Sequence, residues 1–216
     1  METRAHYEIA TAMRYLYLQI AALRQLSITF DYLERPDKVL QVYQQAIPYL
    51  GEVSPLLRAC VYADISGAYT QMNQQQEAFR FLELAYAHFP EKYDNEPSYL
   101  STICRYSTLI ICSGLHHLHF GQPDEAAKIF AHIDGLQPKI SMPERIRIDL
   151  LNCQVEVFAE LKHMEQACYY LEAAGKASIA IGSERRFQES FTVFQQMQKT
   201  WKDEPLIRNL ESIFIR

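Results

Sequence analysis

Three histidines and a cysteine lie close together in the middle of the chain, and they are residue types suited to binding a metal. His116, His117 and His119 follow Cys112, and His132 comes later. Imidazole nitrogens and thiolates are the ligands that zinc takes in proteins. On a helix, however, adjacent His116 and His117 point about 100° apart, and Cys112 with His116 supplies only a pair of ligands. A packed or capped histidine is the favoured interpretation, and a metal-dependent enzyme is the less favoured alternative.

Paired carboxylates offer a second possible chemistry. Glu156 and Glu160 share one face of a predicted helix, as a general acid/base pair can, but a solvated helix face has the same spacing. Sequence motifs for a nucleophile elbow, a zinc protease helix, a dinucleotide site and a phosphate loop are absent. The chain is therefore predicted to be no enzyme and to need no cofactor or metal.

Charge and hydropathy exclude several other classes of partner. The formal net charge is −5, and the longest basic run is Arg185-Arg186, which is too little for binding a phosphate backbone. The N-terminus has no apolar segment typical of a signal peptide, and no run of uncharged apolar residues is long enough for a transmembrane helix. We therefore expect no direct contact with nucleic acid or membrane.

The cysteines predict a reducing compartment. They occur in odd number, with no C-x-x-C pair, and each lies within an apolar helical pattern where a free thiol behaves as a small buried hydrophobe. The predicted location is cytoplasmic. The five are Cys60, Cys104, Cys112, Cys153 and Cys168.

The elements that must position these residues are helices throughout. The chain has 7 glycines, whereas average usage gives about 15. Apolar residues recur at steps of three and four between proline and glycine breakers. Several segments open on proline followed by an acid, as at Pro36, Pro123 and Pro143, which is typical of a helix N-terminus. An all-α fold is predicted.

Residues 59–90 resemble a tetratricopeptide (TPR) repeat. Small residues stand where the two helices of a repeat cross, aromatic residues fill the adjacent gaps, and a proline ends the repeat. The residues that carry the match are Tyr62, Ile65, Ser66, Tyr69, Ala78, Ala85 and Pro90.

The same template fits three further segments, with departures from it at Val39, Val155 and Ile133. The template position in the second helix that prefers a small residue falls at 39, 78, 126 and 167, and it holds alanine at the last three, so the repeats are about 40 residues long. The resemblance implies a right-handed α-solenoid of about four helix pairs. One domain is predicted, with a helical extension at 1–19, repeats at 20–181 and a capping helix pair at 184–216. Because Glu2 to Leu33 has neither glycine nor proline, one long helix is expected there.

By resemblance, the first helices of the repeats line a groove that binds a peptide or protein. A mixture of arginine, tyrosine, apolar and acidic side chains in that groove suits a peptide with a basic portion. The family's clamp for a carboxylate terminus is missing, because Ala63 and Gly67 occupy its second-repeat positions. The alternative is that this face packs against another domain. The expected contact residues are Arg24, Gln25, Asp31, Tyr32, Asp64, Gln71, Leu118, Asn152 and Glu156.

A narrower resemblance links the chain to bacterial helix-turn-helix transcription regulators with TPR sensor regions. The long repeats, the low glycine content and the segment from Trp201 to Leu210 carry it. It implies a regulatory sensor, although no helix-turn-helix precedes residue 20. The alternative function is a dimerisation scaffold without a ligand, with a homodimer formed through the C-terminal helices.

Overall fold

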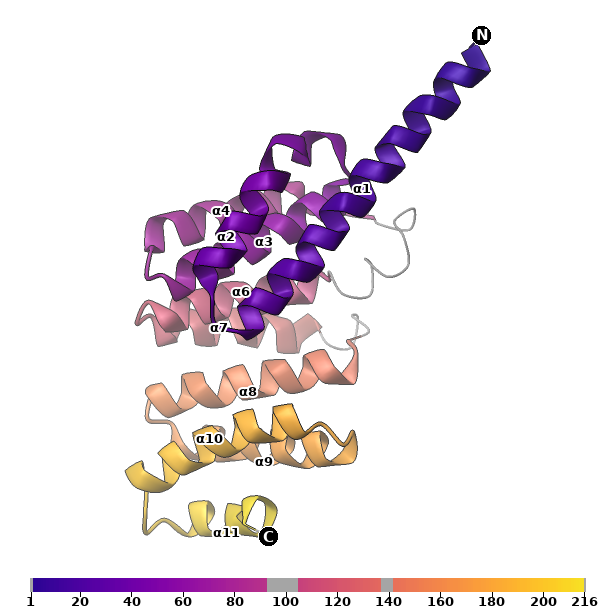
Figure 1. Cartoon of the computed structure of the whole chain (residues 1–216). Coiled ribbons are helices and arrows are strands. Elements are labelled where there is room, and N and C mark those ends of the chain that lie inside the picture. The colour runs from indigo at the N-terminus through magenta and orange to yellow at the C-terminus, as the bar shows by residue number, and fades with distance from the viewer. Residues whose placement is uncertain (1, 93–104, 137–141, 216) are drawn as a thin grey trace. The chain divides into compact units, whose positions relative to one another are not determined.

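The computed structural model describes residues 2–92, 105–136 and 142–215, and the described regular structure is entirely helical (Figure 1). This confirms the all-α prediction. The contacts divide the chain into two compact units, residues 1–112 and 113–216, with the boundary inside one helix. Among the described residues no helix combines the length and hydropathy needed to cross a membrane.

The first unit is built on two antiparallel helix pairs. The long helix α1 (Glu2–Tyr32) pairs with α2 (Pro36–Ala46), a 3-10 turn η1 (Ile47–Glu52) follows, and α3 (Pro55–Gln71) pairs with α4 (Gln75–His88). Figure 1 shows α1 extending past the ends of α2 and α3, in agreement with the single long helix expected before Leu33. Tyr43, Leu56 and Leu57 are fully buried in the core of this unit.

The second unit begins within α6 (Tyr106–His119) and continues through α7 (Pro123–Leu136), α8 (Glu144–Glu160), α9 (Met164–Ala180), α10 (Glu184–Thr200) and α11 (Pro205–Phe214). Its core joins Leu171 of α9 to Phe194 of α10 and Phe214 of α11, and Trp201 packs against it. The predicted helices after residue 184 are therefore present, and Trp201 belongs to their apolar packing as expected.

Five interhelix turns share one backbone geometry. Each contains one residue of positive φ at the end of a helix: Glu34, Asn73, Gly121, Lys162 and Gly182, with φ of 53°, 57°, 72°, 60° and 64°. The N–H of the following residue donates to the carbonyl five residues earlier over 2.8–3.0 Å, and the positive-φ residue donates to the carbonyl three residues earlier over 2.9–3.1 Å. This is the Schellman arrangement, which satisfies the last carbonyls of a helix and reverses the chain.

The small residues expected at the helix crossings are buried there. Ala78, Ala126 and Ala167 have no exposed surface, and the Ser66 hydroxyl donates to the carbonyl of Ala78 over 2.7 Å. At Gly114 an added Cβ would lie 2.3 Å from the Phe130 ring, so only glycine fits. Gly67 also lies inside a first helix but has no such contact, because nothing among the described residues lies within 4 Å of a Cβ added there.

The cysteine prediction is corrected at one position. Cys60 of α3 is disulfide-bonded, with its partner outside the described residues, whereas Cys112, Cys153 and Cys168 are free as expected. A helical hydropathy pattern shows that a thiol is buried but not which other thiol it meets, so it gave no indication of this bond. The prediction for Cys104 lies outside the described residues.

Candidate functional site

In the first unit, α1 and α3 present matching polar residues to each other. Arg24 Nε of α1 lies 2.9 Å from Asp64 Oδ2 of α3. Two helical turns further on, Gln71 Nε2 donates to Asp31 Oδ1 over 2.7 Å. Both contacts join residues 40 apart in the sequence. Four of the predicted contact residues are therefore brought together in pairs, and their polar groups bind each other.

A buried tyrosine forms a hydrogen bond with the carboxylate of the first of these pairs. The Tyr43 hydroxyl of α2 donates to Asp64 Oδ2 over 2.5 Å, and the Ser27 hydroxyl lies 2.5 Å from the Tyr43 oxygen. Burial, followed by the charge of Asp64, raises the pKa of Tyr43 well above its ordinary value. The tyrosine thus remains a proton donor to Asp64 and helps to hold its carboxylate in place. Gln25 and Tyr32, also predicted as contacts, are exposed on α1.

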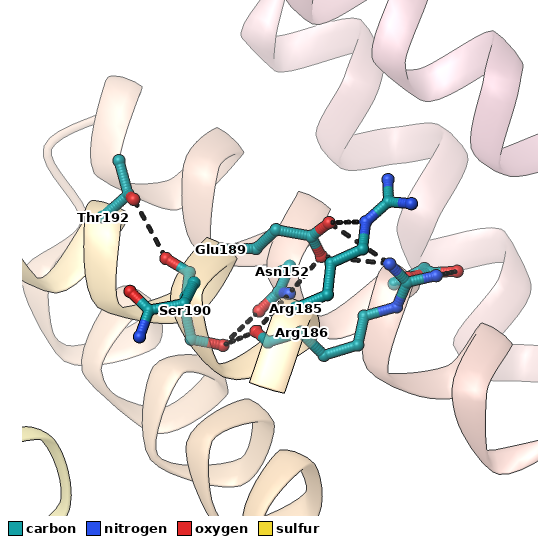
Figure 2. Close-up of polar contacts among 8 residues, drawn as sticks. Asn152, Arg185, Arg186, Glu189, Ser190 and Thr192 are labelled. Carbon is teal, nitrogen blue, oxygen red and sulfur yellow. Dashed lines mark hydrogen bonds and ion pairs between the residues drawn. The ribbon is translucent and has the colours of Figure 1, made fainter. Parts of the chain in front are cut away.

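In the second unit, a comparable polar network joins α8 to α10 (Figure 2). Arg186 forms an ion pair with Asp149, in which Nη2 lies 2.9 Å from Oδ2, and Nη1 donates to Glu189 over 3.2 Å. Asn152 is buried, and its carbonyl oxygen accepts a hydrogen bond of 2.6 Å from Ser190. Asn152, which was predicted to contact a ligand, therefore contacts α10 and helps to set the position of that helix.

Burial makes Asp149 unusually basic for a carboxylate. Desolvation raises the pKa of Asp149 to about 6, with Arg186 lowering it and Glu189 raising it further. Its side chain is 25 % exposed and that of Arg186 is 12 % exposed. Because the ion pair is largely removed from water, it constrains the spacing of α8 and α10 more than a surface pair would.

Beside this network lies a cleft of about 520 Å³ between the C-terminal part of α6, α8 and α10. Two of its lining residues, Leu118 and Glu156, are among the predicted contact residues. Apolar and acidic side chains both contribute to it. The lining residues are Leu118, Glu156, Ala159, Glu160, Glu189, Thr192, Val193 and Gln196.

The carboxylates of the cleft differ in whether an arginine side chain contacts them. Glu189 accepts hydrogen bonds from Arg185 and Arg186. No ion pair joins Glu156 or Glu160 to another of the described residues. Partial removal from water, together with the charge of Glu189, raises the pKa of Glu156 although its side chain still reaches solvent. A cation placed in this cleft would relieve the repulsion between Glu156 and Glu189.

His116, His117 and Cys112 have properties of packed groups, whereas His119 and His132 are exposed. His116 is 3 % exposed, and burial lowers its pKa to about 4, so it is neutral at pH 7. The Nδ1 atom of His117 lies 2.6 Å from Gln122 Oε1, at the start of the next helix. Burial raises the pKa of Cys112 to about 12, which keeps it a thiol. Across the described part of the chain, no group of three or more His, Cys, Asp or Glu side chains is arranged to hold a metal ion.

The residues of α10 that complete the cleft were not predicted, because residues 184–216 were assigned to a cap. Arg186, Glu189, Thr192 and Gln196 recur at helical spacing, and Phe187, Phe191 and Phe194 form the apolar side of the same helix. That polar stripe on an amphipathic helix was the available signal. The apolar face of α11 is used within the unit, with Ile207, Leu210 and Phe214 buried.

Comparison with known proteins gives no relative: no protein-family model, no curated protein and no solved structure matches this chain.

Proposed function

We propose that this chain is a non-enzymatic, TPR-like module that binds a peptide or protein segment carrying basic side chains, with the cleft between α8 and α10 as its principal site. The observation that carries the proposal is the combination in one cleft of Leu118 and Val193 with two carboxylates, Glu156 and Glu160, that have no cation beside them among the described residues. Apolar contacts would bind aliphatic side chains, and the carboxylates would pair with lysine or arginine.

The TPR-like part of the proposal is supported by the regularity of the turns and crossings. Three of the five Schellman turns, at Asn73, Gly121 and Lys162, are followed five residues later by a fully buried alanine, which suits a repeat of paired antiparallel helices. In such a repeat, the first helices of neighbouring pairs lie side by side. The contacts of α1 with α3, and of α8 with α10, have that relation. A right-handed solenoid with a regulatory sensor role belongs to the same proposal.

The test uses a fluorescent amphipathic peptide in three versions whose polar positions carry lysine, glutamine or glutamate. We expect the lysine version to bind most tightly and to weaken with added salt. The double variant Glu156→Gln/Glu160→Gln should weaken its binding about tenfold or more. These residues are exposed, so the fold should be retained, as circular dichroism would verify.

A control with the same change in net charge separates a specific cleft from general attraction to an acidic protein. Glu165 and Glu172 of α9 lie outside the cleft, and the variant Glu165→Gln/Glu172→Gln should bind the lysine peptide as the unmodified protein does. Equal loss of binding in both double variants, or equal binding of the lysine and glutamate peptides, would contradict the proposal.

A further inference from the structure

The long helix α1 has an apolar stripe that no described part of the chain covers. Tyr15, Leu18, Leu26 and Leu33 are 67 %, 53 %, 45 % and 63 % exposed. Ala22 and Thr29, which continue the stripe, are exposed as well. At 3.6 residues per turn these six positions fall within an arc of about 80°, and they extend for about 27 Å along the helix.

The stripe lies on the side of α1 that faces away from its own unit. Ile20 is buried and Leu16 and Leu23 pack against the core on the other side of the helix, near the face that carries Arg24. The hydroxyl of Thr29 donates to the carbonyl of Gln25 within the helix over 3.1 Å, which leaves its methyl group available for apolar contact. No Asp, Glu, Lys or Arg occupies the six positions.

This pattern is that of a helix whose partner is another helix. The steps along the stripe are three, four, four, three and four residues, close to the spacing that keeps one apolar seam facing a second helix. Four large exposed side chains form a patch on the order of 400 Å², in the range where apolar patches mark interaction sites.

We propose that α1 pairs in antiparallel orientation with α1 of a second copy of this chain. The register that sets Tyr15 opposite Leu33 of the other copy also sets Ala22 opposite Leu26, a small side chain against a large one. Arg14 lies at one end of the stripe and Glu34 at the other. Antiparallel pairing therefore brings opposite charges to the same end, whereas parallel pairing would bring Arg14 beside Arg14 and Glu34 beside Glu34.

The proposal selects this surface over the C-terminal helices, which the sequence suggested for a homodimer. The apolar face of α11 is already buried in its own unit, whereas the stripe of α1 is exposed over its full length. Pairing along about 27 Å covers the patch on each copy, so about 800 Å² is buried in total, which is the size of a weak interface that forms at micromolar concentration.

Light scattering during size-exclusion chromatography of the full chain tests the pairing. We expect the protein to become dimeric between about 1 and 100 µM, and Leu18→Glu/Leu26→Glu to be monomeric over that range with an unchanged helical circular dichroism spectrum. Tyr169→Glu is the control, because Tyr169 is 70 % exposed and belongs to α9 of the second unit rather than to α1. A monomeric unmodified protein, or dissociation by Tyr169→Glu and not by the α1 variant, would overturn the proposal.

Cysteine cross-linking tests the orientation. Tyr15→Cys and Leu33→Cys proteins are mixed and treated with a short bismaleimide, with the unmodified chain reporting any reaction of its own thiols. The antiparallel pair predicts cross-linked dimers in the mixture and in the double variant, but not in either single variant alone. Cross-linking of Tyr15→Cys by itself would show a parallel pair and refute the antiparallel proposal. Peptide binding at the α8–α10 cleft plays no part in either readout, so the two proposals can fail separately.

Discussion

Two glycines in helix interiors look alike in the sequence, and replacing each with alanine should change stability in opposite directions. Alanine is favoured over glycine in a helix by about 1 kcal/mol. At Gly67 an added methyl group meets nothing within 4 Å, so Gly67→Ala should stabilise the first unit by about that amount. At Gly114 the same methyl group would lie 2.3 Å from Cζ of Phe130, which is 1 % exposed.

The cost at Gly114 follows from that distance. Carbon atoms in favourable contact are about 3.5–4.0 Å apart, so α6 and α7 must separate or the ring must leave its rotamer. Overpacking of this kind costs about 1–3 kcal/mol. After subtraction of the helix preference, Gly114→Ala should destabilise the second unit by up to about 2 kcal/mol, and it should lie about 1–3 kcal/mol below the effect of Gly67→Ala.

The assay is urea denaturation followed by two signals. Trp201 is the only tryptophan of the chain and lies in the second unit, so its fluorescence reports on the unit that contains Gly114. Circular dichroism follows both units and detects the gain at Gly67. In a Phe130→Leu background the ring is gone, and Gly114→Ala should lose most of its cost. A stabilising effect of Gly114→Ala equal to that of Gly67→Ala would refute the close-contact argument.

Two further predictions concern packing and pH. Ala78→Leu should destabilise the first unit by about 1–3 kcal/mol because Ala78 has no exposed surface, whereas Ala87→Leu on the exposed side of α4 should leave the melting temperature nearly unchanged. The pKa of His116, lowered from 6.5 to about 4, implies a stabilising contribution that is full above pH 6.5 and falls by on the order of 3 kcal/mol as pH drops through 4. The pKa of Asp149, raised from 3.8 to about 6, implies the reverse: a contribution present below pH 3.8 and lost as pH rises through 6. We expect this in urea denaturation followed by Trp201 fluorescence between pH 7 and 4.5. Relative to the unmodified protein at the same pH, His116→Leu should gain stability on acidification and Asp149→Asn should lose it. The same relative slope in both variants would contradict these assignments.

Much of the local structure was readable in the sequence because it depends on neighbouring residues. Prolines at the starts of α2, α3, α7 and α11 match a position where the helix needs no N–H donor. Gly121 and Gly182 occupy positive-φ positions that glycine adopts without strain, whereas Glu34 and Lys162 adopt the same conformation with no such signal. The helices and their small crossing residues thus followed from residue type and spacing.

The candidate site could be predicted only in part. The resemblance to a TPR repeat selected Arg24, Asp64, Leu118 and Glu156, because it implies which positions of the first helices line a groove. It does not identify the groups on the opposite helix, so the pairing of Arg24 with Asp64 and the contribution of α10 to the cleft were not foreseen.

By itself, the sequence determined that this chain is helical, where its helices begin and end, and which small residues stand at their crossings. These properties follow from backbone conformations and side-chain volumes that neighbouring residues specify. The tertiary structure alone decided that Gly114 is in close contact and Gly67 is not, that Asp149 pairs with Arg186, and that the outer face of α1 is left exposed. Each of these depends on which atoms meet across distances of tens of residues in the sequence, and helical periodicity carries no information about that choice.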